Sequence, residues 1–242
     1  MKLIRVKICF VFCGNDYGKN SFWNKCYPES ELFIFKRNDI SSTKIRQNPY
    51  KYWDNIPNIV RPYYTKKVLL IGGESTGKTT LTINLAHYFN TNYIDEAGQD
   101  ISQRSGTDLM MLPGDFTEIL LRHKLNEMKA IEYSNKVLFI DTDALVTQFY
   151  ISFLSDSEAE KNSALSSAID AINSYDLILF LEPDVDFIQN GNRSEVIHQN
   201  RIKYSEQIKK LLNTHNKKFI SINGTYQQRY NKAISAVKKL FV

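Results

Sequence analysis

Short apolar segments alternate with helical repeats from about residue 66 to the end of the chain. Most of the apolar segments are rich in Val, Leu, Ile or Phe and have the length of buried strands. They lie at 67–71, 92–95, 136–140, 176–181 and 218–222. Between them, apolar residues recur at helical spacing. The predicted helices cover 78–89, 115–134, 158–173, 195–213 and 226–240. Strands separated by helices predict a parallel sheet with helices on both faces.

The first 65 residues follow a less regular pattern. They predict a buried strand over 3–13, a turn over 14–18, a second strand over 32–35 and a helix opening over 41–45. Ser41 or Ser42 would cap that helix. Three prolines at positions 49, 57 and 62 then interrupt regular structure. We therefore expect one segment over 1–65 and a separate domain over 66–242.

A glycine-rich turn joins the first strand of the larger domain to its first helix. Residues 72–79 read Gly-Gly-Glu-Ser-Thr-Gly-Lys-Thr and fit G-x-x-x-x-G-K-[ST], the phosphate-binding P-loop. Glycines let the main chain approach a triphosphate, and backbone N–H groups at a helix N-terminus attract the anion. Lys78 is expected to reach the β- and γ-phosphates and Thr79 to offer its hydroxyl to Mg²⁺. The predicted ATP site comprises Gly72, Gly73, Glu74, Ser75, Thr76, Gly77, Lys78, Thr79 and Thr80.

The strand predicted over 136–140 ends in a carboxylate, Asp141. This is the Walker-B arrangement, in which an Asp beside the P-loop holds Mg²⁺. Asp143 follows two residues later, and on an extended backbone the two side chains would share one face. One carboxylate could then hold the metal while the other orients or deprotonates an attacking hydroxyl. The alternative for Asp143 is a helix N-cap.

Further candidate residues follow the predicted strands, where ligands of parallel sheets bind. Glu96 could bind ribose hydroxyls, unless it is a solvated loop acid. Arg193 is the first candidate and Arg201 the second for a basic lid over the γ-phosphate, and the alternative for both is an ordinary surface arginine. His123, on the helix before the Walker-B strand, could face the cleft. Residues 223–225 are either an adenine-contacting loop or a plain turn.

Composition and charge narrow the class of protein. The chain has 242 residues, of which 43% are hydrophobic, and a net charge of +5. The lysines are spread out with no basic run among aromatics, so we expect no nucleic-acid partner. Cys9, Cys13 and Cys26 lack a histidine to complete a metal set, and we expect reduced thiols. Neither a signal peptide nor an 18-residue apolar span is evident, which predicts a soluble, cytoplasmic protein.

Taken in order, these motifs resemble the ribosylnicotinamide kinase domain of the NadR family. The resemblance covers 66–242 and rests on the P-loop, on Phe-Ile-Asp-Thr-Asp at 139–143 and on Gly-Asn-Arg-Ser at 191–194. The family's proteins carry a second half, a nicotinamide-nucleotide adenylyltransferase. Upstream, Ile-Ser-Ser-Thr-Lys-Ile-Arg at 40–46 resembles that half's I-S-[SG]-T-x-x-R phosphate motif, and 48–54 and 60–64 resemble the link between the halves.

The resemblance implies a P-loop kinase-like, three-layer α/β/α fold with a parallel sheet. A partial nucleotidyltransferase-like α/β segment would precede it. It further implies ATP-dependent phosphorylation of nicotinamide riboside to nicotinamide mononucleotide in NAD salvage, with ATP and Mg²⁺. The expected catalytic residues are Lys78, Asp141 and Arg193, the metal ligands Thr79 and Asp141, and the substrate contacts Glu96, Asp143 and His123.

The sequence also departs from the family pattern. Ala97 and Gln99 replace an aromatic residue and an arginine after Glu96, and Asn190 replaces an Asp before the lid glycine. The adenylyltransferase's H-x-G-H motif is absent, so we expect no adenylyltransferase activity from this chain, which would be a split-gene product or a shortened protein.

Several alternatives stay open at this point. They are a kinase for another nucleoside or small metabolite, a nucleotide-dependent regulatory or binding protein, and adenylyl transfer restored by a separate chain that supplies the histidines. Self-association is also left open.

Overall fold

The computed structural model describes residues 7–15, 17, 22–36, 40–105, 112–153, 157–188 and 198–241. Internal contacts divide the chain into two units, Met1–Ile56 and Pro57–Val242. The predicted lid motif at 191–194, with Arg193, and Asn190 before it lie outside the described residues.

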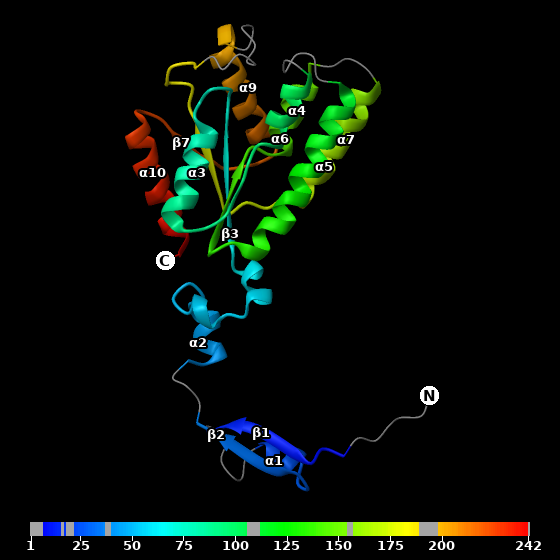
Figure 1. The fold of residues 1–242 in the computed structure, drawn as a ribbon, viewed down its shortest axis with the longest axis vertical. Coiled ribbons are helices and arrows are strands. Elements are labelled where there is room, and N and C mark those ends of the chain that lie inside the picture. The colour runs from blue at the N-terminus through cyan, green and yellow to red at the C-terminus, as the bar shows by residue number, and fades with distance from the viewer. Residues whose placement is uncertain are drawn as a thin grey trace. The chain divides into compact units, whose positions relative to one another are not determined.

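The larger unit is built on a five-stranded parallel sheet (Figure 1). Its strands, in spatial order, are β4 (Tyr93–Ile94), β5 (Val137–Asp141), β3 (Lys66–Gly72), β6 (Leu177–Leu181) and β7 (Ile220–Ile222). Every neighbouring pair is parallel. The strand that leads into the P-loop, β3, is therefore central, and the predicted parallel α/β fold is confirmed. Each predicted strand of this region is present, with ends displaced by two residues at most.

Helices cover both faces of this sheet (Figure 1). They are α3 (Lys78–Phe89), α4 (Ala97–Ser105), α5 (Pro113–Ala130), α6 (Ala144–Ile151), α7 (Ser157–Ile172), α9 (Arg201–Thr214) and α10 (Tyr226–Lys238). Short 3₁₀ turns are η2 (Asn58–Tyr63), η4 (Ile131–Tyr133) and η5 (Lys239–Phe241).

Alternate residues of β3 enter two separate cores, as the pleat of a strand requires. Val68 and Leu70 pack with side chains of α3 and α10. Leu69 and Ile71 pack on the opposite face with side chains of α6 and α9. Because both faces of β3 are buried, the strand reads as a continuous apolar run, and the result is the expected three-layer α/β/α arrangement.

The start of α5 corrects one detail of the prediction. The sequence predicts that this helix begins at residue 115, but it begins at Pro113 with Leu112 at the N-cap. The carboxylate of Asp115 accepts a hydrogen bond from the backbone N–H of Leu112 at 2.8 Å. Proline suits the first helical position because its missing N–H would have no partner there, so the helix starts two residues earlier than predicted.

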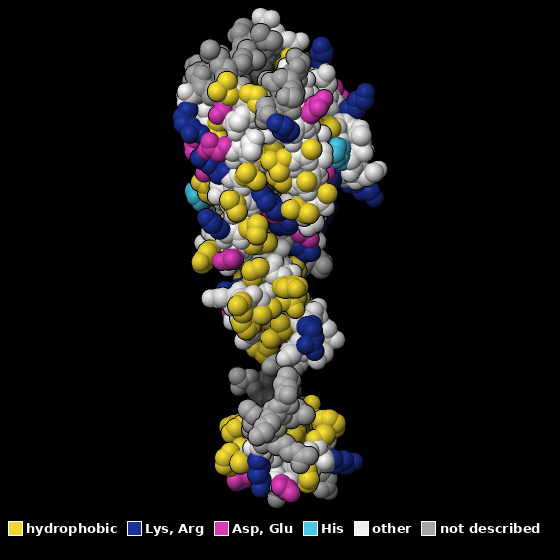
Figure 2. Space-filling view, turned by 90° about the vertical axis from the view of Figure 1, so that its right-hand side faces the viewer, with side chains coloured by type: hydrophobic (Ala, Val, Ile, Leu, Met, Phe, Trp, Pro, Cys, Tyr) yellow, Lys and Arg dark blue, Asp and Glu magenta, His cyan; other side chains and the backbone are white. Residues whose placement is uncertain are grey.

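One face of α5 stays exposed although the helix packs against α7 and α6. Leu121, Leu125 and Met128 recur at helical spacing, and each is about half exposed. Figure 2 shows hydrophobic side chains on the side of the larger unit where α5 and α7 lie in Figure 1.

Within the described residues, no helix combines the length and apolarity needed to cross a bilayer.

The smaller unit contains two parallel strands, β1 (Phe10–Gly14) and β2 (Glu31–Phe35). Its short helices are α1 (Phe22–Cys26), α2 (Ser42–Gln47) and η1 (Trp53–Asn55). Ser41 caps α2, as predicted, by accepting the N–H of Lys44 at 3.3 Å. The prediction of a buried first strand is wrong for Phe10 and Phe12, which are 55% and 64% exposed. Their rings pack against those of β2, and that aromatic face is largely open.

The division between the units falls between Ile56 and Pro57, whereas we expected it near residue 65. The turn η2 contacts η4, and both belong to the larger unit. That residues 1–65 derive from a nucleotidyltransferase-like domain stays a prediction.

Candidate active site

The P-loop connects β3 to α3, as the sequence predicts. Ser75 and Gly77 have φ angles of 55° and 82°, in the left-handed region. The hydroxyl of Thr76 donates to the carbonyl of Gly73 at 2.8 Å, and the amine of Lys78 donates to the same oxygen at 3.0 Å. Lys78 is thus held over the loop, beside the place where the motif binds phosphate.

Asp141 ends β5 next to this loop, because β5 pairs with β3. Its carboxylate accepts the hydroxyl of Thr79 at 2.5 Å and that of Thr142 at 3.3 Å. Burial raises the pKa of the Asp141 carboxyl, and the charge of Lys78 and the hydroxyl hydrogen bonds lower it in part. A threonine hydroxyl and a carboxylate oxygen in contact form a donor set that suits Mg²⁺, which usually takes one or two protein oxygens together with phosphate oxygens and water.

Asp143 does not share this face, which corrects the expected pairing of the two carboxylates. Thr142, between them, has a φ angle of 68° and turns the chain out of the extended conformation. The carboxylate of Asp143 accepts the N–H groups of Leu145 at 3.0 Å and Val146 at 3.4 Å, so it is the N-cap of α6. The group is 2% exposed, and burial raises its pKa to about 7.

His123 and Glu96 lie on the elements that flank Asp141. The imidazole of His123 is 8% exposed and lies close to the backbone of Asp141. Burial lowers the pKa of His123, which favours its neutral form. Glu96 directly follows β4, and β4 pairs with β5. Contact of Glu96, His123 or Asp143 with a nucleoside stays a prediction.

Arg201, the second lid candidate, is turned toward protein backbone. It is 9% exposed and donates to the carbonyl groups of Val185 at 2.6 Å and Ser75 at 3.1 Å. These two contacts tie it to the P-loop and to the segment after β6.

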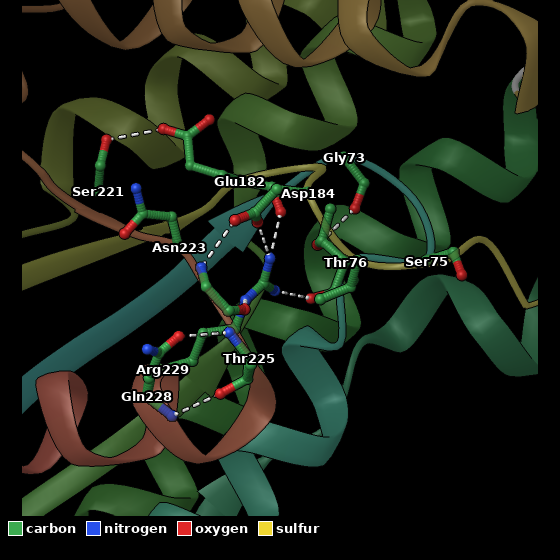
Figure 3. A network of polar contacts seen from close by, with 12 residues as sticks. Gly73, Ser75, Thr76, Glu182, Asp184, Ser221, Asn223, Thr225, Gln228 and Arg229 are labelled. Carbon is green, nitrogen blue, oxygen red and sulfur yellow. Dashed lines mark hydrogen bonds and ion pairs between the residues drawn. The ribbon is translucent and has the colours of Figure 1, made fainter.

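Sequence reasoning missed Arg229, in the first turn of α10. Its side chain is 2% exposed and meets the P-loop at Thr76 (Figure 3). A sequence signal exists, since residues four apart share a helical face and Arg229 lies on the face of the buried Ala233 and Val237. A charged residue on an apolar face usually has buried partners.

Comparison with known proteins agrees with this geometry. A family model described as an AAA domain matches residues 67–229. The trifunctional NAD biosynthesis/regulator protein NadR of Salmonella typhimurium strain LT2 is 32% identical over 205 residues, which are 84% of this chain and 49% of that protein. The chain therefore spans about half the length of the curated relatives it matches.

Solved structures of NadR proteins have the same fold. One, in complex with NR, superposes with a TM-score of 0.79 at 24% identity and covers 97% of this chain and 69% of that one. Another, in complex with NAD and AMP-PNP, has a TM-score of 0.72 at 24% identity and covers 88% and 61%. The homology to NadR expected from the motifs is thus confirmed, and the chain belongs to the family of the matching AAA domain.

Proposed function

We propose that this chain transfers the γ-phosphoryl group of ATP to the 5′-hydroxyl of nicotinamide riboside, forming nicotinamide mononucleotide. One observation carries the proposal. The P-loop, with Lys78 and Thr79, meets the buried carboxylate of Asp141 at the carboxyl end of the central strands. This arrangement supplies both a cradle for a triphosphate and oxygens for its metal ion.

The residues divide the work of phosphoryl transfer. The hydroxyl oxygen of the acceptor bonds to the γ-phosphorus and the hydroxyl proton passes to solvent, while the bond from that phosphorus to the β–γ bridging oxygen breaks and ADP leaves. Lys78 would exchange its contact with the Gly73 carbonyl for the β- and γ-phosphate oxygens, where negative charge is concentrated. Thr79 and Asp141 would hold Mg²⁺, which neutralises charge on the phosphate oxygens. Backbone N–H groups of the loop hold the phosphates in place.

The choice of nicotinamide riboside rests on the relatives. One solved NadR structure contains NR and another contains the ATP analogue AMP-PNP. We assign Glu96 and His123 to the nucleoside side of the site because both lie next to Asp141. Arg193 remains our proposal for the lid arginine. We also propose a cytoplasmic location and a nucleoside, rather than a nucleic acid, as the partner.

A direct assay tests the proposal. Purified protein is incubated with Mg-ATP and nicotinamide riboside, and the products are followed by mass spectrometry. We expect nicotinamide mononucleotide with no further conversion to the dinucleotide, because the sequence contains no H-x-G-H motif. If ATP binds and no mononucleotide forms, the proposal is wrong.

A second candidate, a kinase for another nucleoside, is favoured by Ala97 and Gln99 after Glu96. A nucleoside panel in the same assay would reveal that acceptor.

A further inference from the structure

Two arginines from different helices hold consecutive carbonyl groups of the P-loop. Arg201 begins α9 and donates to the carbonyl of Ser75 at 3.1 Å. Arg229, in α10, donates to the carbonyl of Thr76 at 2.7 Å, and Figure 3 shows its side chain reaching from the helix to the loop. Both side chains are nearly excluded from solvent.

The same two arginines also hold the segment that follows β6. Arg201 donates to the carbonyl of Val185 at 2.6 Å. Arg229 donates to the carbonyl of Glu182 at 2.8 Å and pairs with the carboxylate of Asp184. Each guanidinium therefore joins the P-loop to residues 182–185, and the loop is fastened at two adjacent peptides.

These contacts fix the direction of two backbone N–H groups. In a planar trans peptide, the carbonyl of one residue and the N–H of the next point in opposite directions. The backbone contains no cis peptide among the described residues. With the carbonyls of Ser75 and Thr76 held by arginines, the N–H groups of Thr76 and Gly77 point away from those arginines, as the anion cradle of a P-loop requires.

We infer that Arg201 and Arg229 are positioning residues of the P-loop, which orient the N–H groups of Thr76 and Gly77 toward the phosphates of the nucleotide. The left-handed conformation of Ser75 makes such bracing useful, because a non-glycine residue rarely holds it without support. Ser75 has a further bond, from the N–H of Ile188 to its hydroxyl at 2.8 Å.

Arginine is the residue type that this position needs. The fork of Arg229 also donates to the carbonyl of Gly224 at 2.9 Å, so its donors meet three carbonyl groups and one carboxylate. A lysine carries the same charge on a single amine and cannot reach acceptors spread around a planar fork. Arg229→Lys should therefore keep only part of the hydrogen bonding that orients the P-loop, and Arg229→Met should keep none of it.

The test measures the binding of phosphate ligands to the full chain in the absence of the nucleoside. Affinities for ATP and for pyrophosphate are determined by titration calorimetry on wild type, Arg229→Lys, Arg229→Met and Arg201→Met. We expect Arg229→Met to weaken both ligands about tenfold or more, since hydrogen bonds that orient charge-binding groups are lost. Lys238→Met is the control, because Lys238 lies at the far end of the same helix, with its amine 5.2 Å from the centre of the Tyr88 ring, and does not contact the P-loop. It should change both affinities less than about twofold.

Two outcomes would overturn the inference. One is a folded Arg229→Met whose affinities for ATP and pyrophosphate match wild type. If Arg229→Met does not fold, the second outcome is that both Arg229→Lys and Arg201→Met bind ATP and pyrophosphate as tightly as wild type.

The inference rests on the proposed function in taking ATP as the ligand, yet the two can fail separately. If wild type binds ATP but makes no mononucleotide, the proposed reaction is wrong, and the binding test of the two arginines can still be carried out. Where the reaction does occur, the KM for ATP should rise in Arg229→Lys while the KM for the nucleoside stays within about twofold. A merely structural role would change both constants together.

Discussion

The carboxyl group of Asp143 makes the stability of the fold depend on pH. An unfolded Asp titrates near pH 4, whereas burial raises the pKa of Asp143 in the folded chain to about 7. Between these values the folded state binds more protons than the unfolded state, so the free energy of unfolding falls as pH rises from about 4 to 7 and then levels off. Among charged groups, Asp170 raises the pKa of this carboxyl further and Lys217 lowers it.

Asp143→Asn should remove this dependence while the cap of α6 is kept, because the amide oxygen still accepts the N–H groups of Leu145 and Val146. The free energy of unfolding of the variant minus that of wild type should rise by about 2–3 kcal/mol as the pH is raised from 5 to 8. Chemical denaturation of both proteins across that range measures the difference. A constant difference at all pH values would contradict the assigned titration. Loss of activity by more than about tenfold would support the predicted contact of Asp143 with the substrate.

Lys78 and Asp141 carry the charges that the proposed reaction needs. Lys78→Ala removes a cation where the transition state is most negative, and kcat should fall about 100-fold or more. Asp141→Asn should do nearly as much damage if its carboxylate serves Mg²⁺. Lys66→Ala is a matched control, since Lys66 lies at the other end of β3 and pairs with Asp176 at 2.7 Å. Near-normal turnover in a folded Lys78→Ala protein would remove Lys78 from the mechanism.

At the scale of elements, two glycines near helix starts should respond in opposite ways to alanine. Gly224, before α10, has a φ angle of 96°, and a Cβ there would lie 2.4 Å from Oε1 of Gln228. Gly224→Ala should lower stability by about 1–2 kcal/mol. Gly114, in α5, has nothing within 4 Å of such a Cβ, so Gly114→Ala should raise stability by about 0.5–1 kcal/mol. Thermal unfolding of both variants measures the two changes, and equal changes would contradict this expectation.

Elements with a clear apolar pattern were the ones that sequence could predict. The runs of β3 and β5 are buried apolar strands, and the P-loop motif fixes the turn and the helix start that come after β3. The helix α6 was missed because Ala144–Ile151 is apolar almost all round and shows no helical stripe. The helix α4 was missed for the opposite reason, since Ala97–Ser105 is mostly polar and contains a glycine.

At the scale of the whole molecule, the local sequence pattern does not predict contacts between residues that are far apart in the sequence. Lys78, Thr79 and Asp141 could be found from motifs, because each motif is contiguous. Arg229 and Thr76 are 153 positions apart, and Arg201 and Ser75 are 126 apart. Only the folded sheet brings α9 and α10 to the P-loop, so the bracing of the loop could not be read from spacing. The prediction that Asp143 shares a face with Asp141 assumed an extended backbone. Thr142, between them, has a left-handed conformation, which the sequence pattern does not reveal.

The division into two units predicts how the chain tolerates shortening. A protein that starts at Pro57 keeps the five-stranded sheet, the P-loop and the contact of η2 with η4, so it should fold and show the same proposed kinase activity as the full chain. A protein that starts at Lys66 lacks η2 and the buried Thr65, and should lose roughly 1–3 kcal/mol of stability. Denaturation and turnover of both fragments test this. If the fragment from Lys66 is as stable as the one from Pro57, η2 contributes nothing and the boundary near residue 65 is correct. If the fragment from Pro57 is inactive although folded, the smaller unit takes part in the reaction, and the site is larger than the P-loop domain.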